Sequence, residues 1–258
     1  MPRKKVALVL GGGGALGCAH IGVIKVLEKY NVPIDIVVGT SMGGVVGAGY
    51  VSGLSVKEMT ELASKFKTVN FVDFNFDNSG LFSGKGVMKV INKFLPDTNI
   101  ETLPKTFACV AADIKSEKEI VFKIGSLRDA VRATLSIPGI FVPLKKDDMI
   151  LVDGGILNNL PEDVAMEMGA DIIISSDVMY NFRPAHNPKN VVETLLYSIN
   201  LSTKELQKVK ACHADVSLRT NMKGLSQMAY SKEKAMLAIK RGEKETLEHI
   251  DEILKLLK

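Results

Sequence analysis

The chain has 258 residues, of which 46% are hydrophobic and 24% are charged, a composition typical of a globular protein with a sizeable core. This composition excludes a disordered chain, a collagen and a disulfide scaffold. The formal net charge of +4 is spread over 33 basic and 29 acidic residues, so no nucleic-acid partner is predicted. The three cysteines, Cys18, Cys109 and Cys212, are widely spaced, which favours reduced thiols. No Cys-x-x-Cys pair occurs, so no metal site is predicted.

The amino terminus begins like a signal peptide, with a basic start at 1–5 and an apolar run at 6–10. Glycines interrupt that run well before the roughly 7–15 apolar residues that a signal peptide needs. A buried strand followed by a glycine loop explains these residues better. Since no run of about 18 apolar residues occurs, no transmembrane helix is predicted. We therefore expect a cytoplasmic protein.

Short apolar runs alternate with helical patterns along the chain, which predicts a βαβ protein with a largely parallel sheet. In chain order we expect a strand at 6–10, helix 15–30, strand 36–38, helices 43–51, 56–67 and 85–95, strand 106–113, a hairpin partner at 120–124, helix 127–135, strand 149–152, helix 162–168, strand 172–175, helix 191–210, strand 214–218 and one or two helices over 232–257. Residues 68–83 contain four of the ten phenylalanines. They are interpreted as a packed loop or edge strand, or as a hydrophobic flap over a pocket.

A glycine-rich turn from Gly11 to Gly17 follows the first strand and opens a helix. Glycine lets several N–H groups face one anion, and the helix dipole adds positive potential at the same place. The spacing of Gly12, Gly14 and Gly17 also fits a dinucleotide fingerprint, which expects an acidic residue at the end of the second strand. Asp35 stands at the beginning of that strand, so a nucleotide-binding module is the weaker interpretation.

Residues 39–43 form a G-x-S-x-G pattern, with Ser41 at its centre, between a predicted strand and a predicted helix. This context is typical of a nucleophile elbow, a sharp turn that exposes a serine hydroxyl at the carboxyl end of a sheet. The alternative is a helix N-cap formed by Thr40 or Ser41. A nucleophilic serine usually needs a histidine as base. None of the four histidines stands in a recognisable motif: His20, His186, His213 and His249.

Asp153 ends an apolar strand and is followed by Gly154 and Gly155. This places the aspartate at the same carboxyl edge of the sheet as Ser41. The alternative is an ordinary turn aspartate that accepts a hydrogen bond from the backbone that follows.

Together, the three motifs resemble the patatin-like phospholipase family, particularly its compact bacterial members. The resemblance covers residues 6–161, where the glycine loop 12–17, the elbow 39–43 and the block 153–155 occur in order, and 136–141 resembles the stretch before the family's aspartate. Residues 162–258 match more loosely. The resemblance implies one hydrolase domain over 1–258. Its fold would be a three-layer α/β/α arrangement with a central, mostly parallel sheet, related to the α/β-hydrolase architecture.

The resemblance implies a dyad in which Ser41 is the nucleophile and Asp153 the general base. Backbone N–H groups of Gly12, Gly13 and Gly14 would form the oxyanion hole. The glycines that would support the motifs are Gly17, Gly39, Gly43, Gly154 and Gly155. The implied activity is that of a serine esterase or lipid acyl hydrolase, of phospholipase A or lysophospholipase type, which forms an acyl-enzyme. It would use no metal and no organic cofactor.

One residue departs from the family pattern, because Leu16 stands where the glycine loop commonly has Arg or Lys. Loss of that cation is expected to weaken the oxyanion hole or the preference for phospholipid. The substrate is expected to be an acyl lipid or another ester, and the sequence leaves the oligomeric state open. Residues 68–83 and the helix 191–210 are candidates for peripheral membrane contact. An amphipathic helix more often buries its apolar side in the core, as we expect for 191–210.

Two further interpretations stay open beside the nucleotide-binding module. One is an α/β-hydrolase esterase with a Ser–Asp–His triad, in which His186 or His213 follows Asp153 in the expected chain order. The other is a non-catalytic regulatory module that keeps a lipid pocket.

Overall fold

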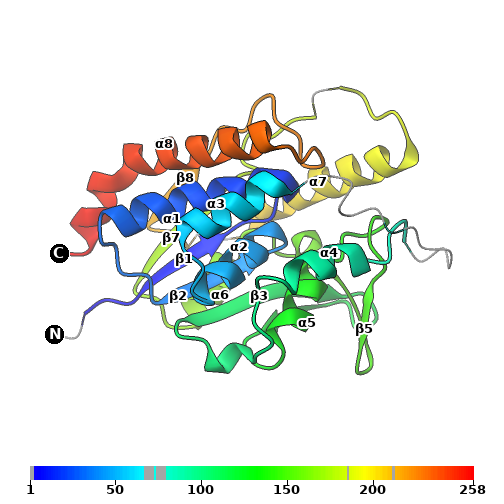
Figure 1. The fold of residues 1–258 in the computed structure, drawn as a ribbon, viewed down its shortest axis with the longest axis horizontal. Helices are drawn as coiled ribbons and strands as arrows, with labels where there is room; N and C mark the ends of the chain where they lie inside the picture. The colour runs from blue at the N-terminus through cyan, green and yellow to red at the C-terminus, as the bar shows by residue number, and fades with distance from the viewer. Residues whose placement is uncertain (1–2, 67–72, 74–79, 185, 211–212) are drawn as a thin grey trace.

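The computed structural model describes residues 3–66, 73, 80–184, 186–210 and 213–258. Within these residues, eight strands form one central sheet (Figure 1). They are β1 (Val6–Leu10), β2 (Ile36–Thr40), β3 (Thr106–Asp113), β4 (Lys118–Phe122), β5 (Leu144–Lys146), β6 (Met149–Asp153), β7 (Ile172–Asp177) and β8 (Val216–Arg219). The strand order is β5-β6-β3-β2-β1-β7-β8, and β4 also pairs with β3.

The sheet is mostly parallel, as the sequence predicts. The pairs that join β3, β2, β1, β7 and β8 are parallel, whereas β4, β5 and β6 pair antiparallel. Every residue of β1 and β2 is buried, because both strands have neighbours on each side and helices on each face. In this register Leu10 lies opposite Gly39 on one side and Ser176 on the other. The ends of three parallel strands therefore meet at one edge.

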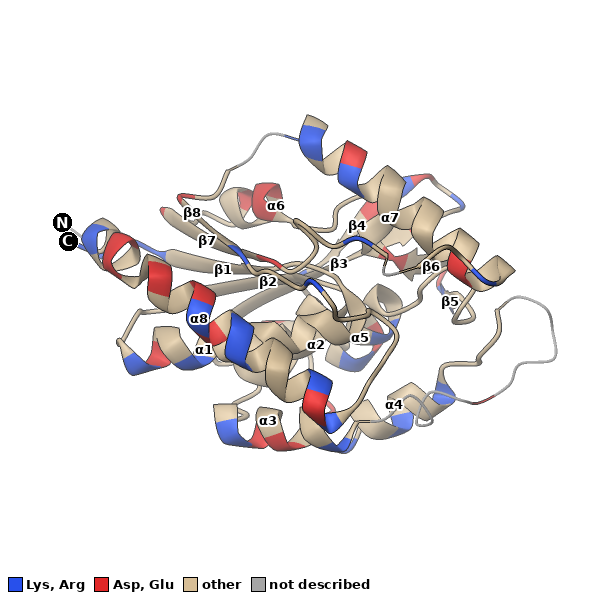
Figure 2. Cartoon of the chain, turned by 90° about the horizontal axis from the view of Figure 1, so that it is seen from above, with Lys and Arg blue, Asp and Glu red and all other residues tan. Residues whose placement is uncertain are grey.

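Helices cover both faces of the sheet, which makes three layers (Figure 2). The helices are α1 (Ala19–Lys29), α2 (Met42–Val51), α3 (Val56–Lys65), α4 (Lys85–Ile91), α5 (Leu127–Thr134), α6 (Glu162–Glu167), α7 (Val191–Val209) and α8 (Lys232–Leu256). The helices α6 and α7 lie on one face, and α1, α2 and α8 lie on the other. The predicted α/β/α fold class is confirmed.

Three segments differ from the expected elements. Residues Gly14–Cys18 form a 3-10 turn before α1 begins, because the glycine loop turns too tightly for an α-helix. The strand β5 was not predicted, since its lysines hide the apolar pattern; it pairs with β6 across a turn in which Asp147 has φ 52°. The helix α7 has no buried residue. Val192 and Leu196 nevertheless pack half-buried against the core, so the prediction that the helix buries its apolar side there is confirmed in part.

The structure describes part of what the sequence predicted about membrane spans, cysteines and the phenylalanine-rich segment. In the described part of the chain, no helix is both long and apolar enough to cross a membrane. Cys18 and Cys109 are free and buried, while Cys212 lies outside the described residues. Most of the expected flap at 68–83 also lies outside them, so that interpretation stays a prediction.

The helices α1 and α8 cross at two glycines. A Cβ atom at Gly242 would lie 2.1 Å from the carbonyl oxygen of Ala19, and one at Gly22 would lie 2.0 Å from that of Ile239. Atoms cannot approach so closely, so the helix backbones pack at this distance only because both residues lack a side chain.

We expect Gly242→Ala to lower the free energy of unfolding by about 1–3 kcal/mol, because the methyl group must push the helices apart. This loss would occur although alanine favours a helix by roughly 1 kcal/mol over glycine. Urea unfolding followed by circular dichroism measures it. Lys240→Ala, on the exposed side of α8, is the matched control and should change little. A more stable Gly242→Ala protein would contradict the close crossing.

Candidate active site

Ser41 lies in a strained turn between β2, which ends at Thr40, and α2, which begins at Met42. Its backbone has φ 53° and ψ −125°, a conformation that costs a non-glycine residue about 1–3 kcal/mol. Two hydrogen bonds hold the turn. The Ser41 amide donates to Oγ1 of Thr134 at 2.7 Å, and Oγ1 of Thr40 donates to the carbonyl of Asn158 at 2.8 Å.

The motif glycines pack against their neighbours too closely for any side chain. A Cβ atom at Gly17, Gly39, Gly43 or Gly154 would come within 2.0–2.5 Å of another atom. At Gly43 that atom is the carbonyl oxygen of Leu10, so the start of α2 lies directly on the end of β1. Gly155 is less crowded, with 3.0 Å to Oδ1 of Asn159. The glycines thus bring the loop, the elbow and the aspartate block together.

Asp153 is buried at the end of β6 and lies beside Ser41. Its amide donates to the carbonyl of Ser136 at 2.9 Å, and its Oδ1 accepts a hydrogen bond from the Gly155 amide at 2.8 Å. Burial raises the pKa of the carboxyl from 3.8 to about 6, although hydrogen bonds from the Ser41 side chain and the Gly155 amide oppose that rise. Near neutral pH the carboxylate can therefore accept a proton from a group in contact with it.

The glycine loop lies directly against Ser41, since a Cβ at Gly12 would be 3.2 Å from that of Ser41. The Gly12 amide donates to the carbonyl of Asn159 at 3.0 Å. By contrast, the amides of Gly13 and Gly14 have no acceptor among the described residues. Of the three predicted oxyanion donors, Gly13 and Gly14 are the ones whose N–H groups are available in this conformation.

Two asparagines after Asp153 join the separate parts of the site. The carbonyl of Asn158 accepts from Thr40, and Asn159 contacts the loop through the Gly12 amide and through its own Nδ2, which donates to the Gly12 carbonyl at 3.3 Å. No role was predicted for either asparagine. In the sequence they stand out only as an Asn-Asn pair shortly after the Asp-Gly-Gly block.

In the described part of the chain, no histidine is hydrogen-bonded to Ser41. His20 is buried between Oγ of Ser176 at 2.9 Å and the carbonyl of Gly11 at 2.8 Å, and burial lowers its pKa to about 4. It therefore braces the glycine loop as a neutral ring. All four histidines are described, and none lines the cavities that contain Ser41.

Asp35 and Leu16 do not take part in this site. Both Asp35 carboxylate oxygens accept from the Arg3 guanidinium, at 2.9 and 2.5 Å, at the beginning of β2. The residue is thus at the opposite end of the strand from the glycine loop. Leu16 is 1% exposed in the core, so its side chain packs inside the protein instead of facing a ligand.

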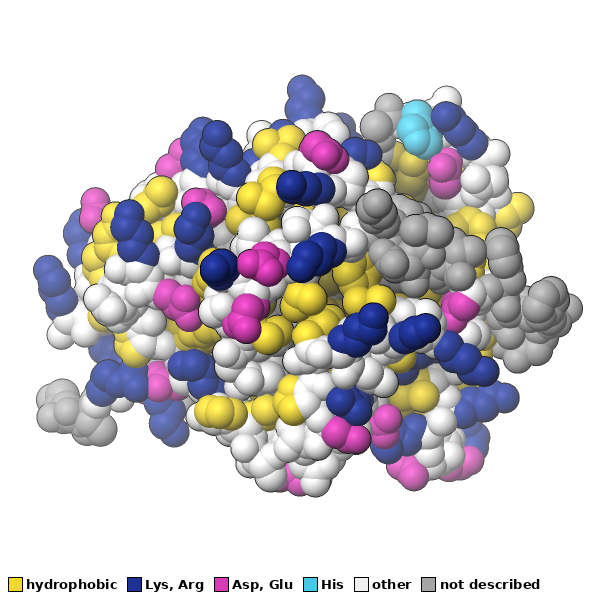
Figure 3. All heavy atoms as spheres, viewed as in Figure 1, with side chains coloured by type: hydrophobic (Ala, Val, Ile, Leu, Met, Phe, Trp, Pro, Cys, Tyr) yellow, Lys and Arg dark blue, Asp and Glu magenta, His cyan; other side chains and the backbone are white. Residues whose placement is uncertain are grey.

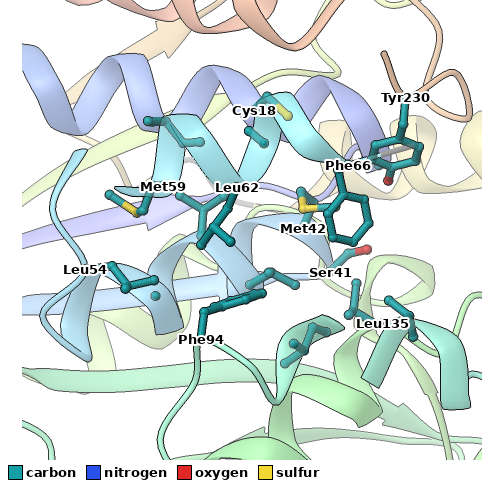
Figure 4. A pocket seen from close by; sticks show the side chains of 18 of the residues that line it. Cys18, Ser41, Met42, Leu54, Met59, Leu62, Phe66, Phe94, Leu135 and Tyr230 are labelled. Carbon is teal, nitrogen blue, oxygen red and sulfur yellow. The ribbon is translucent and has the colours of Figure 1, made fainter. Parts of the chain in front are cut away.

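An apolar pocket of about 100 Å³ begins at Ser41 and runs along α2. Ser41, Leu135 and Tyr230 lie at one end, and Leu54 and Met59 lie at the other (Figure 4). The helices α3 and α4 supply side chains to its walls. Figure 3 shows apolar side chains at the surface between these two helices.

A second cavity of about 70 Å³ also contains Ser41, together with Asp153. It lies beneath α7, which contributes both apolar and polar side chains to it. Ser41 is therefore the point where an apolar pocket meets a cavity of mixed character.

The fold defines an α/β protein in which a strained G-x-S-x-G turn joins a central parallel strand to a helix. The chain belongs to the patatin-like phospholipase family, whose family model matches residues 8–166. It is 40% identical over 181 residues to human Patatin-like phospholipase domain-containing protein 6, a match that covers 67% of this chain and 13% of that protein. It is 32% identical over 238 residues to an uncharacterized NTE family protein of Mycobacterium tuberculosis, covering 88% of this chain and 41% of the relative.

Solved structures share the fold at lower identity. VipD from Legionella pneumophila superposes with a TM-score of 0.66 at 16% identity, covering 97% of this chain and 67% of VipD. ExoU from Pseudomonas aeruginosa, in its complex with SpcU, gives a TM-score of 0.50 at 14% identity, covering 98% of this chain and 53% of that chain. The chain spans well under two thirds of the length of the sequence relatives it matches.

The raised pKa of Asp153 predicts how its replacement changes stability. Above pH 6 the folded protein buries a charge that the unfolded chain exposes to water, which costs roughly 3 kcal/mol. Below the unfolded pKa the carboxyl is neutral in both states, and this cost disappears. We expect Asp153→Asn to raise the free energy of unfolding by roughly 1–3 kcal/mol at about pH 8, because an amide carries no charge.

Urea unfolding at about pH 8 and at about pH 3, which is below the unfolded pKa, measures this difference, and the gain should vanish at the lower pH. Asp148→Asn, at a carboxylate whose side chain is 94% exposed, is the matched control. A gain of equal size at both values of pH would show that the effect does not come from the buried charge.

Proposed function

We propose that the protein is a lipid acyl hydrolase that cleaves carboxylic esters through an acyl-enzyme on Ser41. The observation that carries the proposal is the position of Ser41, which lies in a strained turn beside a buried aspartate and at the mouth of an apolar pocket. The family to which the chain belongs supports the same activity. The cytoplasmic location and the single hydrolase domain over 1–258 stay predictions.

In the proposed reaction, Asp153 accepts the hydroxyl proton of Ser41 while Oγ attacks the ester carbonyl carbon. The C–O bond to the alcohol then breaks, and the alcohol leaves with the proton from Asp153. Water attacks the resulting acyl-enzyme, and its proton passes to Asp153, which returns it to Oγ when the fatty acid leaves. A carboxyl with a pKa of about 6 suits both directions of transfer near neutral pH.

Negative charge develops on the carbonyl oxygen in both halves of this reaction. The unpaired amides of Gly13 and Gly14 are the proposed donors to that oxygen, and such a donor is worth about 3–4 kcal/mol in comparable sites. Hydrogen bonds from Gly12 and Ala15 to the carbonyls of Asn159 and Gln227 hold the loop on each side. These two hydrogen bonds support a loop that would not have to move when the substrate binds.

The apolar pocket is the proposed site for the acyl chain. Its wall follows α2 from Met42 to Gly49, a distance of roughly 10 Å along a helix. Burial of each methylene group contributes about 0.8 kcal/mol, so chains that fill the pocket should react faster than short ones.

We expect a fluorophosphonate probe to add once to the wild-type protein and not to Ser41→Ala, because the activated hydroxyl is the atom that reacts. Intact-mass spectrometry measures the adduct, and circular dichroism checks that the variant is folded. A single adduct that survives in Ser41→Ala would contradict the proposal. No adduct on the folded wild type, with or without detergent micelles, would favour a non-catalytic lipid-binding module.

The same assay separates the dyad from a histidine-dependent triad. His186→Ala and His213→Ala should keep most of the labelling rate and of the esterase activity, because neither side chain lines a cavity at Ser41. A loss of about a thousandfold in either variant would instead point to a triad.

We expect Gly49→Leu to shorten the acyl pocket, since the new side chain would extend toward Leu54 and Met59 at its far end. Losing contacts with two methylene groups should lower kcat/KM for a long-chain ester by roughly tenfold. Hydrolysis rates of p-nitrophenyl esters of increasing chain length measure the effect. The butyrate ester is the internal control and should react at nearly the wild-type rate. An equal loss on all chain lengths would contradict the assignment of the pocket.

A further inference from the structure

We infer that the cleft beneath α7 takes the alcohol half of the ester and that the Lys204 ammonium binds a phosphate group on that alcohol. This inference rests on the proposed function and names a residue of the same site that would determine its specificity. Ser41 lines two different cavities. If the acyl chain lies in the apolar pocket along α2, the alcohol must leave Ser41 by the other cavity, which also contains Asp153.

The lining of that other cavity suits a polar alcohol. Hydrogen-bonding side chains reach it from α7 and from the loops around it: Asn159, Asn200, Thr203, Lys204, Gln207 and Gln227. Amides and hydroxyls of this kind can bind the hydroxyl groups of a glycerol unit. A wholly apolar alcohol would leave them without partners.

The cavity continues into a larger groove of about 550 Å³. Asn159, Thr203, Lys204 and Gln207 line both of them, so Lys204 lies where the two meet. A group attached to an alcohol at Ser41 would therefore pass this ammonium on its way to the groove.

Lys204 has a half-buried ammonium with no anionic partner. Its Nζ donates to the carbonyl of Phe182, and within the described residues no carboxylate oxygen lies within 4.0 Å of it. Other lysines of the groove are paired, Lys208 with Glu205 and Lys210 with Asp163. Lys204 is thus the lysine of this groove that has a charge left to neutralise.

Neighbouring charges favour an anion at this position. Burial is the largest of the causes that lower the pKa of Lys204. The positive charges of Arg183 and Lys208 lower it further, whereas the negative charge of Asp177 raises it. The Asp177 carboxylate already accepts hydrogen bonds from the Met179 amide and from Gln207. A phosphate group would relieve the repulsion between the cations, and ammonium–phosphate hydrogen bonds are among the strong ones.

The test compares two esters with the same acyl chain, octanoyl glycerol phosphate and octanoyl glycerol, at concentrations below micelle formation. We expect Lys204→Met to lower kcat/KM for the phosphate ester by about tenfold or more, since a hydrogen bond to a charged group is lost. The uncharged ester should change by no more than about twofold, and Lys204→Arg should keep most of the preference, because the cation remains. Lys244→Met, an equal loss of charge on an exposed side chain of α8, is the matched control.

Equal losses on both esters would show that Lys204 only holds α7 through the Phe182 carbonyl, and they would overturn the inference. So would an unchanged ratio in Lys204→Met. Circular dichroism and the melting temperature check that each variant is folded. Because the readout is a ratio between two substrates, a general weakening of the fold does not imitate the expected result.

Binding to Ser41→Ala separates this inference from the proposed function. By calorimetry, Ser41→Ala should bind the phosphate ester about tenfold more tightly than the uncharged one, and the added Lys204→Met should remove that difference. If the wild type hydrolyses neither ester, the proposed function fails, and this binding experiment still decides the role of Lys204. Inorganic phosphate that binds as tightly as the ester would indicate a site for free phosphate and overturn the substrate role.

Discussion

The conformation of Ser41 is the constraint on which the rest of the site depends. A serine held at positive φ is unfavourable alone, so the surroundings must supply the difference. The Thr134 hydroxyl does so by accepting from the Ser41 amide and donating to the carbonyl of Val110 at 2.5 Å. This one side chain joins the elbow to β3, whose antiparallel partner β6 ends at Asp153. The turn and the aspartate are therefore fixed to the same strand.

The second costly feature is the burial of Asp153. A carboxyl group that ionises only near pH 6 destabilises the folded protein at neutral pH. The same burial keeps the group basic enough to accept a proton from a hydroxyl in contact with it. Strain at Ser41 and desolvation at Asp153 both lower stability where chemistry is proposed, and the fully buried parallel strands β1 and β2 offset these costs.

Much of this arrangement could be predicted from the sequence. Apolar runs at 6–10 and 172–175 predicted strands, because strands of a parallel sheet are buried on both faces and are therefore apolar along their whole length. The motifs at Ser41 and Asp153 predicted that these two side chains would meet. The predicted reason, a shared carboxyl edge of parallel strands, does not hold, because β6 runs antiparallel. Asp153 lies near Ser41 because it pairs with Ala111 of β3, next to the residue that pairs with Thr40. The sequence did not show which glycine amides would be free to donate, because the Gly12 amide donates to the carbonyl of Asn159, a residue far away in the chain. That α7 would have no fully buried residue was not predicted either, since periodicity indicates an apolar side but not how completely it is covered.

The attachment of α7 has a consequence for how this architecture can vary. Its inner side is held by half-buried side chains and by individual hydrogen bonds, such as that from Thr203 to the carbonyl of Gly155 at 2.9 Å. The hydrogen bonds that hold the Ser41 turn come from Thr134 and Asn158, neither of which belongs to this helix. Substitutions along it can therefore reshape the wall beside the aspartate while β1, β2 and the elbow keep their geometry. In the proposed enzyme, the residues that select the substrate and those that perform the reaction therefore belong to different parts of the fold, so that either set can change while the other is kept.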